Sequence, residues 1–521
     1  MKRLFFLILT AFALTLCAAA YEIESAEISA DAVTVRVSAD ADCALFVALY
    51  DADGRLISVQ TREVSASDSV VTVTITGGIP EGATAKTFLT GADGKPLCKS
   101  ETATDNGGDN PEPTPTDDNG VYAILYSDGT LVFQHGNAPE SGRDVRNTYA
   151  VDVTETYYNN YTITTPWYDE REFISYVDFA DTIQPTSTAW WFYGFKKLKE
   201  IKNIGNLDTT SVTEMSGMFD GCHALTSLDL SAFNTANVTD MQEMFYDCHA
   251  LTSLNLSAFN TANLTNMRWM FRGCTALASL DLTPLNTANV TDMREMFFGC
   301  TALASLNLTS FHTENVTDMM GMFYNCAALA SLDLSSFNTG NVTHMSYMFS
   351  GCTALSSLNL ASFNTENVIN MGHMFRSCGA LASLNLTSFH TENVREMEYM
   401  FYGCGALASL DLTAFNTENV TNMGRMFYGC RALASLDLSA FNTANVANMT
   451  EMFFYCSCLT TVYASEQFVT SQATSSTGSM FNDCDCLVGG AGTTYDSEHQ
   501  NADYAHIDGG PENPGYFTAK T

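Results

Sequence analysis

The apolar positions of this chain recur every 26 residues over most of its length. Each copy reads roughly C-x-A-L-x-S-L-[DN]-L-x-x-F-[NH]-T-x-N-V-x-x-M-x-x-M-F. A 26-residue period lies within the range of leucine-rich repeats, whose coils stack because one coil cannot bury its apolar side alone. The pattern predicts an α/β leucine-rich-repeat solenoid of about 11 coils with a parallel sheet on one side. The repeated cysteines are Cys222, Cys248, Cys274, Cys300, Cys326, Cys352, Cys378, Cys404, Cys430 and Cys456.

Within one copy, the pattern predicts a strand followed by a helix. The L-x-x-L-x-L spacing of 225–230 favours a short strand. The three-and-four spacing of Val238, Met241, Met244 and Phe245 predicts about two helical turns. The residue before each cysteine is usually Gly, or else Asp247 or Asn325, and these residue types suit the left-handed geometry that ends a helix. The asparagine before the valine is the expected helix N-cap, at Asn237, Asn263, Asn289, Asn315, Asn341, Asn367, Asn393, Asn419 and Asn445.

Two regions precede the solenoid. Residues 21–104 alternate apolar and polar positions and contain turn pairs, which predicts a small β-sandwich (Ig-like) module. Residues 105–120 are rich in Pro, Asp and Gly and read as a linker. Short strand patterns in 121–190 predict an N-terminal capping module. The solenoid then spans 191–490, and 491–521 form a C-terminal cap and tail.

The first 20 residues have the pattern of a signal peptide. Lys2 and Arg3 precede an apolar run that is too short to span a bilayer, and cleavage is expected near Ala20. The alternative is a lipoprotein acylated on Cys17, although Leu16 before it is not the usual small residue. No later segment has the length of a membrane helix. We therefore expect a secreted or cell-surface protein.

The charge balance restricts the partners. Acidic residues number 58 and basic residues 23, giving a formal net charge of −35. Such a surface repels nucleic acid and anionic lipid. With 46% hydrophobic and 16% charged residues, the chain has the composition of a folded protein.

The cysteine ladder has three interpretations: disulfides, a soft-metal site and buried thiols. Equivalent cysteines of stacked coils have parallel Cβ vectors, which fit disulfide torsions poorly, so buried thiols are favoured. The chain has no C-x-x-C pairs or spaced His ligands, and no metal or other cofactor is predicted. Better disulfide candidates are Cys43 with Cys98, around the sandwich, and Cys458 with Cys486, at the irregular end.

Two columns of the repeat are candidate binding surfaces. The first varies between copies and carries residue types that favour interfaces, although drift at unconstrained positions predicts the same variability. Its members are Trp269, Tyr347, Tyr399, Arg268, Arg294 and Arg425. The second is a polar column on the strand that could hold calcium, meet a basic partner or simply face solvent. Its acidic members are Asp229, Asp281, Asp333, Asp411 and Asp437.

The repeat text resembles the BspA-like leucine-rich-repeat surface proteins of bacteria. The resemblance includes the entry segment 185–194, PTSTAWWFYG, and the exit segments within 487–517, and it covers roughly residues 121–517. It implies a secreted or surface-displayed protein that adheres to host matrix proteins, host cells or other bacteria. The family has no assigned catalytic residues, and none is inferred for this chain.

Three functions remain open at the level of sequence. The chain has no phosphate loop, G-x-S-x-G elbow or H-E-x-x-H motif, so we do not expect an enzyme. The favoured hypothesis is an adhesin-like, non-catalytic solenoid that binds protein or glycan partners outside the cell. The alternatives are a structural surface spacer without a specific ligand and an enzyme whose site lies in residues 21–190.

Overall fold

The computed structural model describes residues 21–29, 32–39, 43–50, 56–64, 70–74, 84–90, 101–104, 120–155, 157–159, 162–473 and 477–520. The chain forms two compact units, Met1–Thr116 and Asp117–Thr521, and the division falls within the expected linker. The expected signal peptide, Cys17, Cys98 and the side chain of Cys43 lie outside what is described, and those expectations stay predictions. Within the described residues, no helix has the length and apolar character required to cross a membrane.

The first unit contains two antiparallel sheets. One sheet has the order β1-β2-β5 and the other β4-β3-β6-β7. Leu45 and Val47, two residues apart on β3, are both fully buried, as alternation along a strand requires. The strands are β1 (Tyr21–Ser29), β2 (Ala32–Ala39), β3 (Cys43–Tyr50), β4 (Leu56–Val64), β5 (Val70–Thr74), β6 (Thr84–Thr90) and β7 (Glu101–Thr104).

The second unit begins with a five-stranded sheet of order β10-β8-β9-β13-β14. The β8–β9 and β8–β10 pairs are antiparallel, whereas the β9–β13 and β13–β14 pairs are parallel. The pairing thus changes within this sheet from antiparallel to the parallel pairing found in the coils. Its strands are β8 (Val121–Tyr126), β9 (Thr130–His135), β10 (Val145–Ala150), β13 (Tyr176–Phe179) and β14 (Glu200–Lys202). The shorter elements here are β11 (Tyr158–Asn159), β12 (Thr162–Ile163), η1 (Tyr168–Glu170) and η2 (Ile204–Asn206).

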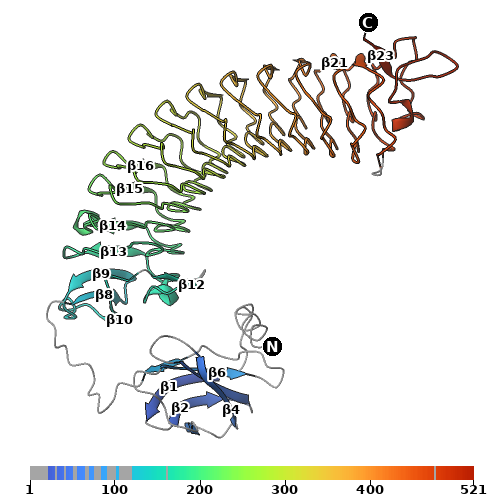
Figure 1. The fold of residues 1–521 in the computed structure, drawn as a ribbon. Helices are drawn as coiled ribbons and strands as arrows, with labels where there is room; N and C mark the ends of the chain where they lie inside the picture. Colours follow the sequence, from blue (N-terminus) through green and yellow to red (C-terminus); the bar gives the residue numbers. More distant parts are fainter. Residues whose placement is uncertain are drawn as a thin grey trace. The chain divides into compact units, whose positions relative to one another are not determined.

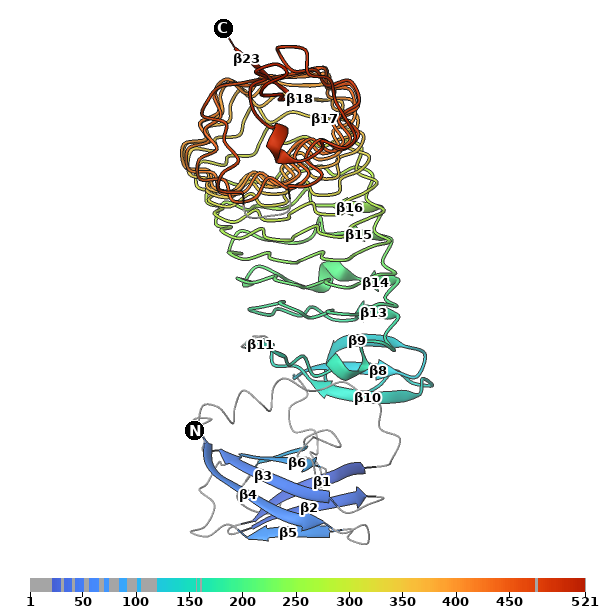
Figure 2. The same cartoon turned by 90° about the vertical axis from the view of Figure 1, so that its right-hand side faces the viewer.

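The coils then stack one after another, with their short strands on one side of the stack (Figures 1 and 2). Neighbouring strands are parallel and offset by one repeat, so Ser227 pairs with Ser253. The strands are β15 (Ser227–Asp229), β16 (Ser253–Asn255), β17 (Ser331–Leu332), β18 (Ser357–Leu358), β19 (Ser383–Leu384), β20 (Ser409–Leu410), β21 (Ser435–Leu438) and β22 (Thr461–Ala464). The chain ends with η3 (Ala502–Tyr504) and β23 (Phe517–Ala519), which joins β22.

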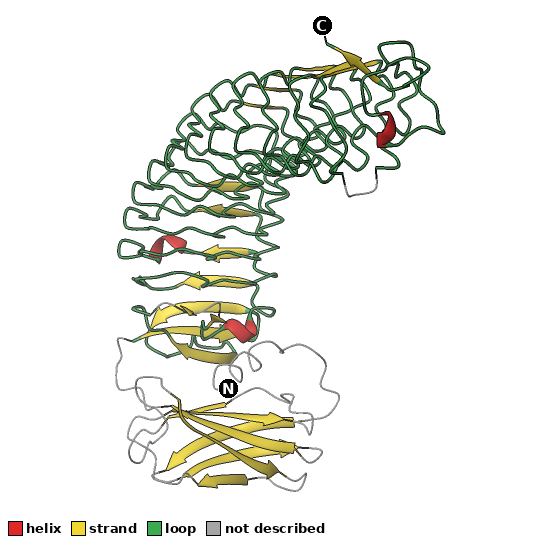
Figure 3. Cartoon of the chain, turned by 45° about the vertical axis from the view of Figure 1, so that its right-hand side comes forward, coloured by secondary structure: helices red, strands yellow, loops and turns green. Residues whose placement is uncertain are grey.

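The expected α/β class is wrong in its helical part. The described residues contain no α-helix, and the coils consist mostly of turns (Figure 3). The expected continuous parallel sheet is also absent from the described coils, where the strands form separate groups of two or three. A series of single bridges, one per coil from Ser187 to Asn448, runs along the stack instead. The fold is a repeat solenoid built from turns and short parallel strands.

The segment expected to be a helix is a run of tight turns. Met244, Tyr246 and Cys248 donate their backbone N–H groups to carbonyls three residues earlier. The alternating N–H groups, as at Glu243 and Asp247, donate to carbonyls 25 residues later in the next coil, at 3.0 and 2.7 Å. Because half of the donors bind the next coil, the four-residue ladder of an α-helix cannot form.

Left-handed residues make this turn pattern possible. Glu243 and Asp247 have φ values of 59° and 53°, and Gly273 and Gly299 have 76° and 72°. The expectation that the position before each cysteine is left-handed is therefore confirmed, although no helix ends there. The three-and-four spacing does not distinguish these turns from a helix, because both bury apolar side chains three or four residues apart. The same Val, Met and Phe side chains are therefore buried without a helix.

The predicted N-cap role of the nine asparagines is also wrong. Each side-chain amide donates along the stack to a backbone carbonyl of the preceding coil, 27 residues earlier. Asn237 Nδ2 lies 2.9 Å from Thr210 O, and Asn341 Nδ2 lies 2.7 Å from Glu314 O. The remaining bonds are equivalent, at 2.7–2.8 Å, for Asn263, Asn289, Asn315, Asn367, Asn393, Asn419 and Asn445.

Buried threonines join the coils inside the core. Thr313 is fully buried, and its Oγ1 donates to Asn338 O and accepts from Asn338 N–H, both at 2.8 Å. The same pair of bonds recurs at the equivalent threonine of each coil from Thr209 to Thr417. A hydroxyl is the one small group that can supply both a donor and an acceptor. Each threonine thus fixes the offset between two coils.

The apolar core runs through all the coils without interruption. One phenylalanine per coil, from Phe219 to Phe453, stacks on its neighbour with ring centroids 5.5–5.8 Å apart and planes within 7°. Phe192 begins the series at the N-terminal side and Phe481 continues it beyond the last regular coil. Phe195 follows the left-handed Gly194 as Cys222 follows Gly221, so it occupies the cysteine position of the first coil.

A helix N-cap and an inter-coil donor predict different effects of Asn341→Asp on stability. Aspartate caps a helix as well as asparagine does. It cannot donate to Glu314 O, and its carboxylate would face that carbonyl. We expect Asn341→Asp to lower the free energy of unfolding by roughly 1 kcal/mol, measured by urea denaturation of the full chain. Asp281→Asn, an exposed exchange of the same two residue types, is the matched control. Unchanged stability of Asn341→Asp would contradict the inter-coil role.

Candidate functional site

The most variable surface of the solenoid is made by the turns that replace the expected helices. We define the turn face as the side chains equivalent to Gln242, Glu243 and Tyr246 in each coil. The Glu243 column is left-handed throughout, with φ of 60° at Trp269 and 56° at Tyr399. Non-glycine residues adopt this conformation at a cost, and here the backbone bonds on both sides hold it in place.

Three aromatic side chains of the predicted binding surface, Trp269, Tyr347 and Tyr399, are half-buried. Tyr347 and Tyr399 stack on the two faces of His373, with centroids 4.2 and 4.5 Å away and planes within 11°. The rings pack because equivalent residues of neighbouring coils are separated by about one strand spacing. Their faces are therefore occupied within the protein, and their edges and hydroxyl groups remain for a partner. Burial lowers the pKa of His373, which favours its neutral form in this stack.

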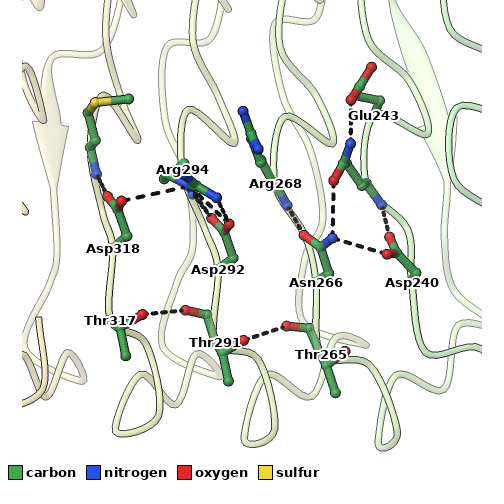
Figure 4. A network of polar contacts seen from close by, with 12 residues as sticks. Asp240, Glu243, Thr265, Asn266, Arg268, Thr291, Asp292, Arg294, Thr317 and Asp318 are labelled. Carbon is green, nitrogen blue, oxygen red and sulfur yellow. Dashed lines mark hydrogen bonds and ion pairs between the residues drawn. The ribbon is translucent and has the colours of Figure 1, made fainter. Parts of the chain in front are cut away.

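The predicted arginines belong to the same ordered surface. The Arg268 guanidinium lies 3.6 Å from the Trp269 ring centroid. Arg294 is paired with Asp292 of its own coil and lies 3.7 Å from Asp318 of the next (Figure 4).

Arg425 is held in a similar way by two neighbouring coils. Its Nε donates to Glu451 at 2.7 Å, and it also donates to the Tyr399 hydroxyl. The structure thus brings Tyr399 and Arg425 together, whereas Trp269 lies several coils away with Arg268. The six predicted residues are spread along the turn face, where their side chains stack on rings or pair with carboxylates.

A polar ladder lies beside the turn face. The side chains of Asp240, Asn266, Asp292 and Asp318 lie next to one another on successive coils (Figure 4). Each accepts a backbone N–H two residues later, at 2.7–3.0 Å, and so closes a local turn. Asn266 also donates to Asp240 at 3.1 Å. These contacts fix the backbone from which the turn-face residues project.

The aspartates of the strand column have a local structural role. Asp229, Asp281, Asp333, Asp411 and Asp437 each accept the N–H of the residue two positions later, at 2.9–3.0 Å. At Asp281, hydrogen bonds from the Thr283 hydroxyl and N–H lower the pKa of the carboxyl. Four of the five are exposed, and Asp437 also pairs with Lys520 at the edge of a groove of about 450 Å³. No group of three or more potential metal ligands occurs within the described residues.

The cysteine ladder consists of buried free thiols, as expected from the sequence. Each thiol donates to the carbonyl of a core phenylalanine in the preceding coil, with Cys300 Sγ 3.1 Å from Phe271 O. Burial raises the pKa of the Cys300 thiol to about 12, so it is protonated and unreactive in the folded state.

The disulfide predicted between Cys458 and Cys486 is not formed, and both thiols are free and exposed. The two residues follow the buried Cys456 and Cys484 by two positions and therefore occupy equivalent places in successive coils. Side chains in equivalent places project in parallel, which does not suit the torsion of a disulfide.

A pocket that the sequence did not predict lies at the N-terminal end of the turn face. It has a volume of about 420 Å³. Its aromatic walls include Tyr168 stacked on Tyr193, with centroids 6.2 Å apart, and Tyr246 edge-on to Trp269 at 6.3 Å. The charged residues in its lining are Arg171, Glu172, Lys196, Asp220, Glu243 and Asp247, together with His223.

Asp220 is the most unusual residue of this pocket. Only 7% of it is exposed, and its carboxyl has no hydrogen-bond or ion-pair partner among the described residues. Burial, followed by Glu243 and Asp247, raises the pKa of Asp220 to about 8. The sequence did contain a signal: in the Tyr246 column the other coils carry aromatic, arginine, serine or asparagine residues, and only Asp220 is acidic.

One family model and one solved structure match this chain. The family model described as "Mycoplasma protein of unknown function, DUF285" matches residues 186–306, 291–408 and 380–489, which together make up more than half of the chain. Among curated proteins, no sequence matches. The crystal structure of a leucine rich cell surface protein from Faecalibacterium prausnitzii A2-165 matches with 15% identity and a TM-score of 0.27. That match covers 72% of this chain and 94% of the other.

The ionisation of Asp220 predicts a stability change with pH. Its pKa of about 8 in the folded state exceeds the ordinary value of about 3.9. The stabilisation from the protonated form is therefore complete below pH 4 and is lost as the pH rises through 8. Asp220→Asn is expected to match the original chain near pH 4 and to exceed it at pH 9 by at least about 1 kcal/mol. Urea denaturation at both pH values measures this, with Asp281→Asn as control. Equal stabilities at pH 9 would contradict the assignment.

Proposed function

This chain belongs to the family described as Mycoplasma protein of unknown function, DUF285. We propose that it functions by binding other molecules through its repeats. The chain is a non-catalytic binding protein of the bacterial surface, and its turn face is the surface that binds. Its partners are proteins or glycans outside the cell, on host matrix, host cells or other bacteria. The resemblance of the repeat to BspA-like surface proteins and the signal-peptide pattern of residues 1–20 support this location.

The observation that carries this proposal is the contrast between the turn face and the rest of each coil. The Leu, Phe, Thr, Asn and Cys columns repeat with little change because their side chains pack on or bond to a neighbouring coil. The turn-face columns change in charge and ring type from coil to coil on the same backbone. They are enriched in Tyr, Trp and Arg, which dominate the energetics of binding interfaces.

The side chains of the turn face are already held in place by one another, which favours binding. The turn-face rings are already stacked and the arginines already paired, so little side-chain entropy is lost when a partner docks. The strand column has fewer groups available to bind a partner, since its carboxylates accept hydrogen bonds within local turns. A spacer without a ligand would have no need for aromatic side chains on its outer turns.

The test uses Tyr402 and Tyr428, whose half-buried rings stack with centroids 4.5 Å apart. The full chain is titrated onto immobilised matrix proteins, mucin and polysaccharides by surface plasmon resonance. We expect saturable binding to at least one of these, weakened about tenfold or more by Tyr402→Ser with Tyr428→Ser. The matched control is Asp281→Asn with Asp333→Asn in the strand column, which should leave binding unchanged.

Two outcomes would overturn the proposal. Absence of saturable binding to every surface would favour the spacer. Equal losses in the two double variants would show that the turn face is not the binding surface. Circular dichroism of each variant ensures that the comparison is made between folded proteins.

A further inference from the structure

The pocket lined by Tyr193, Tyr246 and Trp269 has the composition of a site for an organic cation. Four carboxylates line it against two basic side chains. Both basic residues are already engaged: Lys196 Nζ pairs with Glu172 at 2.7 Å, and the Arg171 guanidinium lies 4.0 Å from the Tyr168 ring centroid. The lining therefore keeps an excess of negative charge.

The remaining carboxylates differ in how they are satisfied. Glu243 accepts a hydrogen bond from Gln242 and interacts with Arg268 and Arg272. Asp247 lies 3.4 Å from His249. Asp220 has neither kind of contact among the described residues, although it is 93% buried. A buried carboxyl without a partner costs free energy, which a ligand of opposite charge would recover.

The aromatic walls suit the same ligand. Ring faces beside a carboxylate recognise ammonium groups through cation–π attraction, and the rings shield the attached methylene groups from water. The volume of about 420 Å³ is within the range of small-ligand pockets. The net charge of −35 also attracts cations to the protein from a distance.

We infer that this pocket binds an alkylammonium group, supplied by a lysine side chain of a basic protein partner, with the Asp220 carboxylate as its counter-ion. This inference rests on the proposed binding function of the turn face, to which Tyr246 and Trp269 belong. It assigns one chemical anchor to the partner and places that anchor at the N-terminal end of the face.

Binding is expected to depend on pH. Without a ligand, Asp220 is mostly protonated at neutral pH, and it must lose that proton to pair with an ammonium group, which itself stays charged up to about pH 10. The titratable and charged groups that interact with Asp220 are Glu243, Asp247, Tyr193, Tyr246, Cys222 and Cys248. With one proton released per ligand, the affinity should rise roughly tenfold from pH 6 to pH 7 and level off above pH 8.

The experiment is isothermal titration calorimetry of the full chain with Nα-acetyl-lysine methylamide at pH 6, 7 and 8.5. Nα-acetyl-norleucine methylamide, which lacks the ammonium group, is the ligand control, and n-butylamine tests whether a free amine suffices. Asp220→Asn should abolish both the binding and its pH dependence, whereas Asp281→Asn should retain them. Trp269→Leu is a second variant, expected to weaken binding at every pH without removing the pH dependence.

The outcomes separate this inference from the proposed function. Saturable binding of the lysine compound that requires Asp220 supports a lysine anchor, and tighter binding of n-butylamine would reassign the site to free amines. No binding at pH 8.5, or equal binding by norleucine or by Asp220→Asn, overturns the inference. If macromolecular binding still requires Tyr402 and Tyr428 in that case, the proposed function stands without this pocket. If the lysine compound binds while the tyrosine variants lose nothing, the pocket stands and the proposed function fails.

Discussion

The hydrogen bonds between successive coils are the constraint on which the structure depends. A coil of turns buries backbone donors and acceptors that it cannot satisfy internally. Half of the turn N–H groups therefore bind the next coil, and Thr, Asn and Cys side chains add bonds to neighbouring backbone carbonyls. These bonds form only when every coil keeps the same offset. The regular spacing of the repeat is the sequence signature of that requirement.

The same constraint limits where function can lie. The Thr, Asn and Cys columns that bond to a neighbouring coil change little along the repeat, and much of the variation falls on the turn face. Close stacking of coils also brings equivalent aromatic rings face to face, as with Tyr347, His373 and Tyr399. A partner then meets ring edges, hydroxyl groups and guanidinium groups. The pocket around Asp220 forms where the regular turns meet the irregular segment that carries Tyr168 and Tyr193.

Much of this architecture could be predicted from sequence, and the errors have physical causes. Periodicity gave the stacking, the buried columns and the left-handed position before each cysteine. It could not distinguish a helix from successive turns, because both place Met241, Met244 and Phe245 inward. Asparagine before an apolar run has the pattern of an N-cap, and only the neighbouring coil reveals its real acceptor. Asp220 was missed because its unusual surroundings come from segments distant in the sequence.

The most direct test of this account is the urea unfolding of the full chain carrying Thr313→Val or Thr313→Ser. Valine has the shape of threonine but neither donates to nor accepts from Asn338, whereas serine keeps the hydroxyl. The account predicts that valine lowers the free energy of unfolding by roughly 2 kcal/mol more than serine does. A valine variant as stable as the serine variant would contradict the claim that these inter-coil hydrogen bonds hold the solenoid together.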